Sequence, residues 1–447
     1  MKIVIAGAGA VGTHLAKLLA REHHDVVLID NSQKRLAGLA NYVDILTIEG
    51  YPMSLDTLEK ADVKSADLVV GVTPEESVNM MCCILAKRMG AKKTVARIDS
   101  NDYLDKTHRE YFQQLGIDSM VYPEGLVGKE INRLIERPWV RQWWEVQDGQ
   151  LVVLGVKMRK GCALLDKPIS EICGQDAPLH ITAIKRAGET IIPHGNDVIR
   201  VNDLAFIMTT ANHVEYVQNV VGKANTPETT NVVYMGSSPS TICSINTLPS
   251  SIHGKVFEPD AEMVERLERK VTNPRVMLFN ADARDTDTLL DENIKNHQVF
   301  IAATDNSETN ILACMAARRL GVPKTIAMVE NSDYIAFAEG LDIGSIINKK
   351  TFAAGHIYRM MLRSDVESVK SLNIAAAAVA EYHVKEGSLI TKRPVKELGF
   401  PAYANIGGFV RRGKGHFVNG ETMFLPGDTV VVFCLDGYLK KLERFFK

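Results

Sequence analysis

The sequence predicts an α/β fold made of two tandem Rossmann-like parallel-sheet domains, each followed by a small α+β lobe. Three observations predict this fold. A strand–glycine loop–helix–strand pattern opens the chain, a second version of it returns about halfway along, and each copy gives way to short strands broken by Gly and Pro. Alternating strands and helices are typical of a parallel sheet with helices on both faces.

The first 30 residues carry the clearest motif. Lys2 to Ala6 is a short β-branched apolar run, as expected of a buried parallel strand. Helical spacing of apolar residues follows, and a second apolar run ends on Asp30, next to Asn31. Between the first strand and the helix lies a G-x-G-x-x-G loop, which consists of Gly7, Ala8, Gly9, Ala10, Val11 and Gly12.

Each part of this motif suits a nucleotide site. Gly7 allows the tight turn, Gly9 lets a pyrophosphate approach the backbone, and Gly12 lets the helix pack on the strand. The helix N-terminus offers N–H groups and partial positive charge to phosphates. Asp30, 18 residues after Gly12, can accept from both ribose hydroxyls and would repel a 2′-phosphate, which favours NAD over NADP. The alternative is a glycine-rich turn without a ligand, and the complete register of strands, helix and Asp30 disfavours it.

Composition limits the classes of function. The chain has 447 residues, 46% hydrophobic and 24% charged, which is typical of a soluble globular protein with several domains. A net charge of −2 leaves no electrostatic footprint for nucleic acid. We expect no signal peptide and no membrane-spanning segment. The seven cysteines form no C-x-x-C pattern, so we expect reduced thiols and no metal site.

The chain is a tandem duplication. The segment from Thr73 to Asn79 ends a buried strand and opens a helix, and the segment from Thr304 to Asn310 does the same 231 residues later. The predicted parts are a Rossmann-like domain at 1–135, a small lobe at 139–222, a polar linker at 222–231, a degenerate Rossmann-like domain at 231–363 and a second small lobe at 367–447.

The second glycine loop has changed. Only Gly236 survives, because Ser238 and Thr241 replace the other two glycines. Pro239 fits the first helical turn, and Glu258 takes the ribose position. Two interpretations stay open: a site altered toward another ligand, such as a nucleoside with fewer phosphates, or a structural copy that does not bind tightly. The loss of the phosphate turn favours the second.

Catalytic machinery is not evident in the sequence. A dehydrogenase needs a proton donor and a substrate anchor facing the nicotinamide. The twelve histidines form no such group, and motifs of the G-x-S-x-G, Walker and H-E-x-x-H types are missing. The sequence therefore predicts a ligand sensor and not an enzyme, with an NAD-dependent oxidoreductase as the alternative. Trp139, Trp143 and Trp144 could line a partner groove, but packing at a domain joint is favoured.

The sequence resembles the cytosolic regulators of potassium channels and transporters built from RCK domains, also called KTN or TrkA-N plus TrkA-C. The resemblance covers essentially the whole chain. Besides the glycine loop and its echoes in the second copy, it rests on Asp30-Asn31, the Thr73–Asn79 turn, Val95-Ala96-Arg97 and Tyr122-Pro123-Glu124.

The resemblance implies a function. Such proteins assemble as rings, usually of four two-unit chains, under the cytoplasmic face of an integral-membrane potassium transporter of the Trk type. NAD(H), or ATP or ADP, binds in the Rossmann-like domains, reshapes the ring and gates ion flow. The implied localisation is cytoplasmic and peripheral to the plasma membrane, through the transporter partner.

The resemblance also implies roles for residues. The glycine loop would carry the phosphates and Asp30 the adenosine ribose, while Thr73 lies at a strand end beside the nucleotide. Arg97 would supply positive charge, and Glu124 matches an acidic position near the nucleotide or its metal in some relatives. Two departures matter. In the first unit, Ala10 replaces an arginine of some ATP-binding relatives. In the second unit, Met328 replaces the counterpart of Arg97, and Lys349-Lys350 stands near the counterpart of Pro123-Glu124. The first puts a preference for ATP in doubt, and the second weakens any second site.

Overall fold

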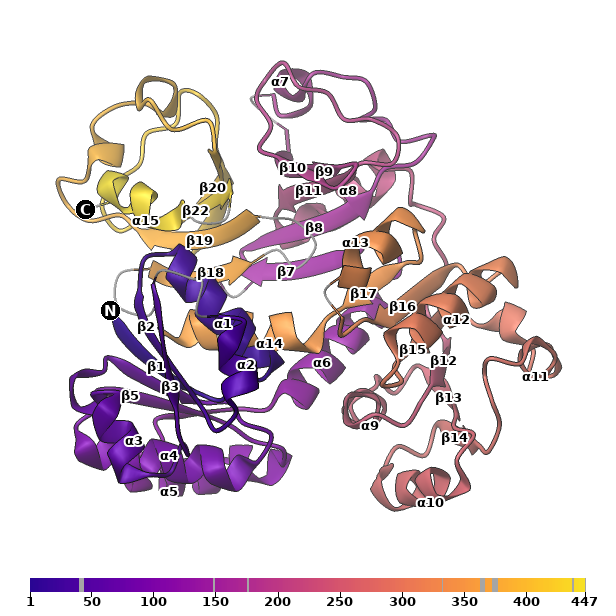
Figure 1. Cartoon of the computed structure of the whole chain (residues 1–447). Helices are drawn as coiled ribbons and strands as arrows, with labels where there is room; N and C mark the ends of the chain where they lie inside the picture. The colour runs from indigo at the N-terminus through magenta and orange to yellow at the C-terminus, as the bar shows by residue number, and fades with distance from the viewer. Residues whose placement is uncertain are drawn as a thin grey trace. The chain divides into compact units, whose positions relative to one another are not determined.

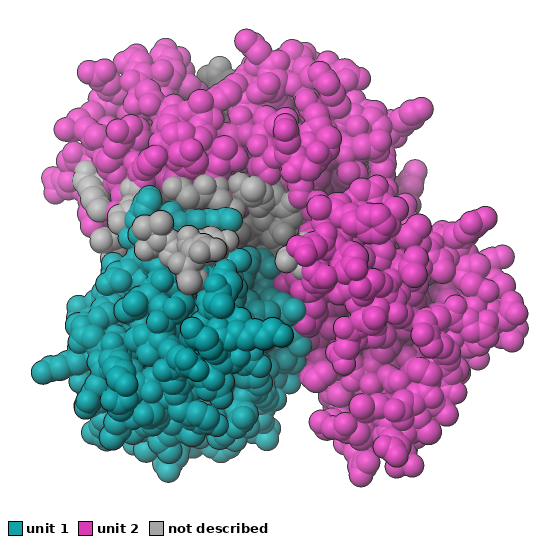
Figure 2. Space-filling model, in the orientation of Figure 1, with its two compact units in different colours: residues 1–126, 349–363 teal, residues 127–348, 364–447 magenta. Residues whose placement is uncertain are grey.

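The computed structural model of the chain divides into two compact units, coloured separately in Figure 2. Unit 1 contains Met1–Leu126 and Lys349–Arg363, and unit 2 contains Val127–Asn348 and Ser364–Lys447. The structure describes residues 1–39, 44–147, 149–174, 177–331, 333–361, 366–371, 377–435 and 438–446. The domain ends predicted at 363 and 447 lie outside the described residues. Among those described, no helix is long and apolar enough to cross a membrane.

Unit 1 is built on a fully parallel sheet of order β3-β2-β1-β4-β5-β6, which confirms the Rossmann-like prediction (Figure 1). Its strands are β1 (Lys2–Ala6), β2 (Asp25–Asp30), β3 (Ile45–Glu49), β4 (Leu68–Gly71), β5 (Lys93–Arg97) and β6 (Ser119–Val121). Its helices are α1 (Ala10–Arg21), α2 (Gln33–Ala37), α3 (Leu55–Lys60), α4 (Glu76–Met89), α5 (Lys106–Leu115) and the start of α6 (Pro123–Glu136), with 3₁₀ turns η1 (Val63–Ser65) and η2 (Asn101–Leu104). The strand order reverses between β1 and β4, and ligands of such sheets bind at the carboxyl ends of the strands there.

Unit 2 contains the second parallel sheet, with the equivalent order β14-β13-β12-β15-β16-β17. Its strands are β12 (Asn231–Met235), β13 (His253–Phe257), β14 (Val276–Phe279), β15 (Val299–Ala302), β16 (Lys324–Met328) and β17 (Ser345–Ile347). The helices that follow them are α9 (Pro239–Asn246), α10 (Ala261–Lys270), α11 (Thr286–Asp291), α12 (Ser307–Arg319), α13 (Asp333–Gly340) and α14 (Lys349–Met361), with η4 (Ile294–Asn296). Because the strand order is the same, the duplication read from the sequence holds at the level of topology.

The last helix of each parallel-sheet copy packs on the other copy. Helix α14 belongs to unit 1, where it lies against α1 (Figure 1). From Val127 onward, α6 belongs to unit 2 and packs on α9 so closely that a Cβ added at Gly128 would lie 2.7 Å from Cys243 Cβ. In the same contact the side-chain amide of Asn132 donates to Ser244 O at 3.0 Å. Each parallel sheet is thus completed by a helix from the other half of the sequence.

The two small lobes, both in unit 2, are antiparallel sheets of one topology, with orders β10-β9-β11-β8-β7 and β21-β20-β22-β19-β18. The first contains β7 (Gln142–Val146), β8 (Leu151–Lys157), β9 (Leu179–Arg186), β10 (Glu189–Ile191) and β11 (Leu204–Thr209), with α7 (Ile169–Ile172), η3 (Ala211–His213) and α8 (Val214–Val220). The second contains β18 (Val366–Ser371), β19 (Ala377–His383), β20 (Ala404–Arg411), β21 (Lys414–Phe417) and β22 (Thr429–Leu435), with η5 (Leu389–Thr391), η6 (Val395–Glu397), α15 (Leu439–Leu442) and η7 (Glu443–Phe445). A buried aspartate pairs with an arginine at the same place in each lobe, as Arg186–Asp203 and Arg411–Asp428.

The lobes share an apolar core, and β7 contributes to it. Trp143 and Trp144 are neighbours on this strand and therefore face opposite sides of the sheet. Trp143 packs in the core of the first lobe, whereas Trp144 packs with residues of both lobes, including Val379 and Phe433. Trp139 packs, partly buried, against the first of these cores. The tryptophans are thus packing residues, as favoured from the sequence.

Candidate nucleotide site

The three glycines of the first loop have different physical roles. Gly7 has φ of +116°, and a Cβ there would lie 2.9 Å from the backbone nitrogen of Thr73. A Cβ at Gly12 would overlap the carbonyl oxygen of Gly7. Gly9, in contrast, has an ordinary φ of −68°, and a Cβ there would meet no atom within 4 Å. The fold itself requires glycine at the first and third positions, whereas at Gly9 the missing side chain leaves open space in front of α1.

The N-terminus of α1 is left without a side-chain cap. Gly9 is the N-cap residue, and the first turn carries no acidic side chain. The N–H groups of the first turn, on Ala10, Val11 and Gly12, have no partner within the helix, as in any α-helix. They point into the space beside Gly9 together with the positive end of the helix dipole. This arrangement suits a phosphate or diphosphate.

Asp30 ties the glycine loop to the end of β2. Its buried carboxylate accepts from Ala8 N at 2.7 Å through Oδ2 and from Ser32 N at 2.9 Å through Oδ1. Arg35 Nη1 lies 3.6 Å from Oδ1. A carboxylate has about four acceptor positions, so Asp30 retains capacity for ribose hydroxyls while it braces the loop. Asn31, next to it, is exposed.

Thr73 and Asn79 form a clamp at the ends of β4 and β5. The side-chain oxygen of Asn79 accepts from Thr73 N at 2.7 Å and from Thr73 Oγ1 at 2.8 Å, and its amide donates to the carbonyls of Thr73 and Arg97 at 3.0 Å each. Thr304 and Asn310 repeat the clamp in unit 2. The asparagine side chain therefore holds the strand ends together beside the glycine loop and Asp30, which together form the first cradle.

Arg97 and Glu124 lie together, and α14 adds Lys349 to them. Arg97 Nη2 is 3.9 Å from Glu124 Oε1 and donates to Asp99 Oδ1 at 2.9 Å. Lys349 Nζ lies 3.4 Å from the same Glu124 oxygen. The Glu124 side chain is 8% exposed, and among the described residues neither its Oε2 nor Arg97 Nε has a hydrogen-bond partner. Because unpartnered buried polar atoms are costly, a polar ligand that bonded to these two atoms would stabilise this group.

The second cradle, formed by the loop Gly236–Thr241 and Glu258, caps the N-terminus of its own helix α9. Ser238 Oγ accepts from Thr241 N at 3.2 Å, and Pro239 has no N–H, so the first turn of α9 retains one free donor, on Ser240, where α1 has three. Glu258 keeps the bracing role of Asp30, since its Oε2 accepts from Ser237 N at 3.0 Å. Its Oε1 also accepts from Asp260 N at 3.2 Å, so these two backbone contacts explain the retained carboxylate without a ligand.

A pocket of about 490 Å³ nevertheless opens at the second cradle. It is lined by residues of the loop and by the cations Arg266, Lys270 and Arg284, of which Arg284 pairs with Asp282 at 2.6 Å. The hollow of a nucleotide site thus persists in unit 2, whereas only one of the three N–H donors at the helix start remains.

The predicted site residues fall into two groups within unit 1. The glycine loop and Asp30 meet at the ends of β1 and β2, and Arg97 meets Glu124 at the ends of β5 and the start of α6. Two contributors were missed. The sequence predicts Asn79 only as a helix-opening residue, although its recurrence at Asn310 is a signal, and it places Lys349 near a weakened second site. Among the described residues, no group of three or more His, Cys, Asp or Glu could hold a metal ion.

The fold and the first cradle define a class: proteins with duplicated Rossmann-like nucleotide-binding domains joined to antiparallel lobes. The TrkA-N domain family matches residues 3–123 and 232–349, and the TrkA-C domain family matches residues 153–222 and 379–447. The chain therefore belongs to the family of tandem TrkA-N and TrkA-C proteins.

Relatives of known name span the whole chain. The Trk system potassium uptake protein TrkA of Azorhizobium caulinodans is 28% identical over 455 residues, which cover 100% of this chain and 99% of the relative. A homologue of that name from Methanosarcina mazei, TrkA homolog 2, is 28% identical over 462 residues and covered fully on both sides. Among solved structures, the GsuK channel bound to NAD has a TM-score of 0.60 at 16% identity, covering 100% of this chain and 78% of that one. The GsuK RCK domain has the same TM-score and identity, covering 100% and 94%. These structures show the shared fold.

Proposed function

We propose that this chain is a nucleotide-sensing regulatory subunit of a Trk-type membrane potassium-uptake transporter, with no catalytic turnover of its own. The observation that carries the proposal is the first cradle, where the helix N-terminus is uncapped and the space at Gly9 is open. The names of the full-length relatives support potassium uptake as the process. We expect NAD(H) to be the preferred ligand, with ATP and ADP as the other candidates.

In the proposed complex, each residue group of the first cradle contacts one part of the ligand. The phosphates lie against the first turn of α1, and the adenosine ribose hydroxyls reach the free acceptor positions of Asp30. A carboxylate at this place disfavours the 2′-phosphate of NADP. The NAD bound in the related GsuK channel supports a dinucleotide.

The signal passes through the group of Arg97, Glu124 and Lys349. Glu124 Oε2 is buried and finds no hydrogen-bond partner among the residues that the structure describes, so a ligand hydroxyl, or a metal that accompanies terminal phosphates, would complete it. Phosphate oxygens near Arg97 would compete for the ion pair that Arg97 shares with Glu124, and Lys349 at the start of α14 responds to the charge left on Glu124. A ligand shifts such an equilibrium only by its difference in affinity for the two arrangements. Coupling of about 1–3 kcal/mol per site, multiplied over the chains of a homo-tetrameric ring, is enough for a switch.

The proposal places the protein on the cytoplasmic face of the membrane through its transporter. The test is potassium flux into liposomes that contain the Trk-type transporter of the same organism, with and without this protein. We expect NADH, NAD, ATP or ADP to change the flux only when the protein is present, and the change to disappear in Gly9→Ser. Failure to associate with the transporter, or an unchanged flux with all four nucleotides, would refute the proposal. Turnover at the nicotinamide absorbance band with a small substrate would instead support the oxidoreductase alternative.

A further inference from the structure

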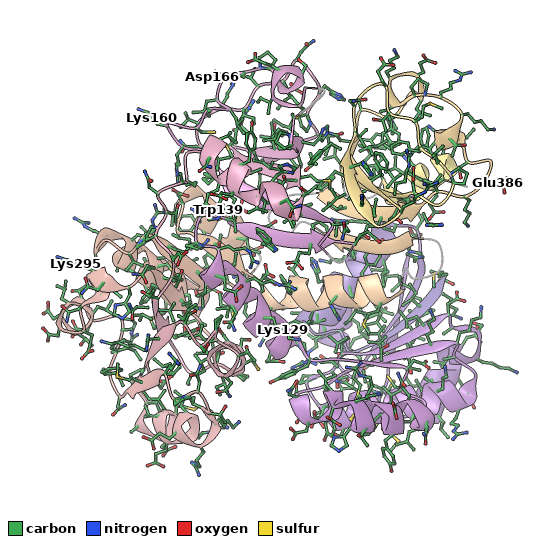
Figure 3. The ribbon with its side chains drawn as sticks, turned by 180° about the vertical axis from the view of Figure 1, so that it is seen from behind. Lys129, Trp139, Lys160, Asp166, Lys295 and Glu386 are labelled. Carbon is green, nitrogen blue, oxygen red and sulfur yellow. The ribbon has the colours of Figure 1, made fainter. Side chains whose placement is uncertain are left out.

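A second charged cavity lies in unit 2, and no residue of either glycine loop lines it. It has a volume of about 330 Å³ and is bounded by the segment before β7, the end of β8, the linker after α8 and the start of β16. Figure 3 labels Trp139, which lines the cavity where the first antiparallel sheet meets the second parallel sheet. We call it the basic cavity, after its six cationic residues, Arg141, Lys157, Arg159, Lys223, Arg318 and Lys324.

The cations outnumber the acids that reach them. The residues lining the basic cavity include no carboxylate. Asp342, at its edge, contacts three of the arginines: Arg141 at 2.8 Å, Arg318 at 3.4 Å and Arg159 through a short ion pair. In the part of the chain that the structure describes, none of the three lysines forms an ion pair. Asp342 is therefore shared by three of the six cations, and Glu339 attracts Lys157 without forming an ion pair, so positive charge is in excess in the basic cavity.

Burial makes this excess of charge costly. Lys324 is 5% exposed, and its ammonium donates to Ser345 Oγ at 2.8 Å and to the carbonyl of Val140. Burial, with repulsion from Arg141, lowers the pKa of Lys324 well below its ordinary value. Burial also lowers the pKa of Arg141 to about 10, and it lowers the pKa of Lys157 and of Lys223. Cations that depress one another's pKa in this way are stabilised by an incoming anion.

We infer that the basic cavity binds a polyphosphate chain, either free or at the end of a nucleotide. Guanidinium groups match phosphate oxygens with paired donors, and lysines add point charges. A single carboxylate ligand would balance only one of the excess charges, whereas a triphosphate balances several. The volume of about 330 Å³ lies at the lower end of the range of ligand pockets, roughly 300–1,000 Å³.

A nucleoside attached to the chain has space nearby. A larger hollow of about 830 Å³ shares Arg141, Lys157 and Arg159 with the basic cavity and continues past the Lys185–Glu339 ion pair. This site is separate from the nucleotide site of unit 1, so the inference does not depend on the proposed function. A ligand here would join the first lobe to the second parallel-sheet domain and thereby stabilise unit 2.

The test is calorimetric titration of the full chain with inorganic triphosphate. The informative variant is Lys157→Gln with Lys223→Gln, because neither lysine belongs to the ion pairs of Asp342, so the substitutions break no salt bridge and relieve repulsion from Arg141 and Arg159. The matched control is Lys160→Gln with Lys295→Gln, which removes the same charge from two exposed lysines outside the cavity (Figure 3). We expect triphosphate to bind the wild type, to bind the cavity variant at least tenfold more weakly, and to bind the control unchanged.

A second arm identifies the source of the phosphates. ATP is titrated into Gly9→Ser, in which the first cradle is blocked. Loss of ATP affinity on adding the cavity substitutions would assign the site to a nucleotide, and a response to triphosphate alone would assign it to free polyphosphate. The inference is overturned if triphosphate fails to bind the wild type below millimolar concentrations, or if the cavity variant and the control lose affinity equally.

Discussion

Replacing Gly9 by serine tests whether the first cradle is built for a ligand. The second unit already carries a serine at this place, and Ser238 Oγ caps Thr241 N. In Gly9→Ser, the new hydroxyl can accept from Gly12 N in the same way. A Cβ at Gly9 meets no atom within 4 Å, and its φ of −68° is open to any residue, so the fold accepts the change.

The structure predicts that Gly9→Ser raises the free energy of unfolding and lowers the affinity for NADH. A serine N-cap is better than glycine by a few tenths of a kcal/mol, and removing a glycine from the unfolded chain adds about 0.4–1 kcal/mol. We expect the free energy of unfolding to rise by up to about 1 kcal/mol. Binding loses at least one charge-assisted donor, about 1.5–3 kcal/mol, and the side chain occupies the space of the diphosphate. NADH affinity should therefore fall at least 10- to 100-fold.

Urea denaturation and NADH titration by calorimetry measure the two quantities on the same preparation. The matched control is Ser238→Gly, which should leave NADH affinity unchanged and lower the free energy of unfolding by up to about 1 kcal/mol, because the cap is lost and a glycine is added to the unfolded chain. If Gly9→Ser binds NADH as tightly as the wild type, the assignment of the phosphates to the α1 N-terminus is wrong. A large loss of stability would show that Gly9 serves the fold instead.

Three further predictions follow from the contacts. Asp30→Asn should weaken NADH binding about tenfold and lower the free energy of unfolding by about 1.5–3 kcal/mol, because an amide replaces one of two accepting oxygens. Glu258→Gln should lower the free energy of unfolding alone, and urea denaturation with NADH titration compares the two variants. Asn79→Ala should lower the free energy of unfolding by about 3 kcal/mol, since the buried backbone groups it holds lose their partner; an unchanged urea midpoint would contradict the clamp. Gly128→Ala should destabilise by about 1–2 kcal/mol because its Cβ would meet Cys243, while Gly355→Ala in α14, with open space, should stabilise by about 0.5–1 kcal/mol; thermal melts giving the same sign for both would refute the helix packing.

The sequence was sufficient for the features that depend on local signals. Buried β-branched runs, the spacing of the glycines and the recurrence of Thr73–Asn79 at Thr304–Asn310 predicted both parallel sheets and the eroded second loop. The serine at position 238, where the first copy has Gly9, also predicts a loss of N–H donors for phosphate, because a serine at a helix start caps the backbone of its own helix.

The sequence could not predict features that depend on which part of the fold a helix or side chain packs against. Helix α14 has the same apolar periodicity whichever copy it packs on, so its place against α1 is decided only by tertiary contacts. Lys349 therefore joins Glu124 in unit 1, although its position in the repeat assigns it to the second site. The basic cavity was likewise hidden, because its cations come from separate segments of the chain and share one acid, Asp342.

The most direct test of the central claim is the number of NADH molecules bound per chain. We propose that the first cradle, with its three free N–H donors, binds tightly and that the self-capped loop at Ser238 has no site of comparable strength. Calorimetric titration of the full-length protein should therefore give one tight site per chain, abolished by Gly9→Ser and untouched by Ser238→Gly. Two equivalent tight sites per chain, or a site that survives Gly9→Ser, would contradict it.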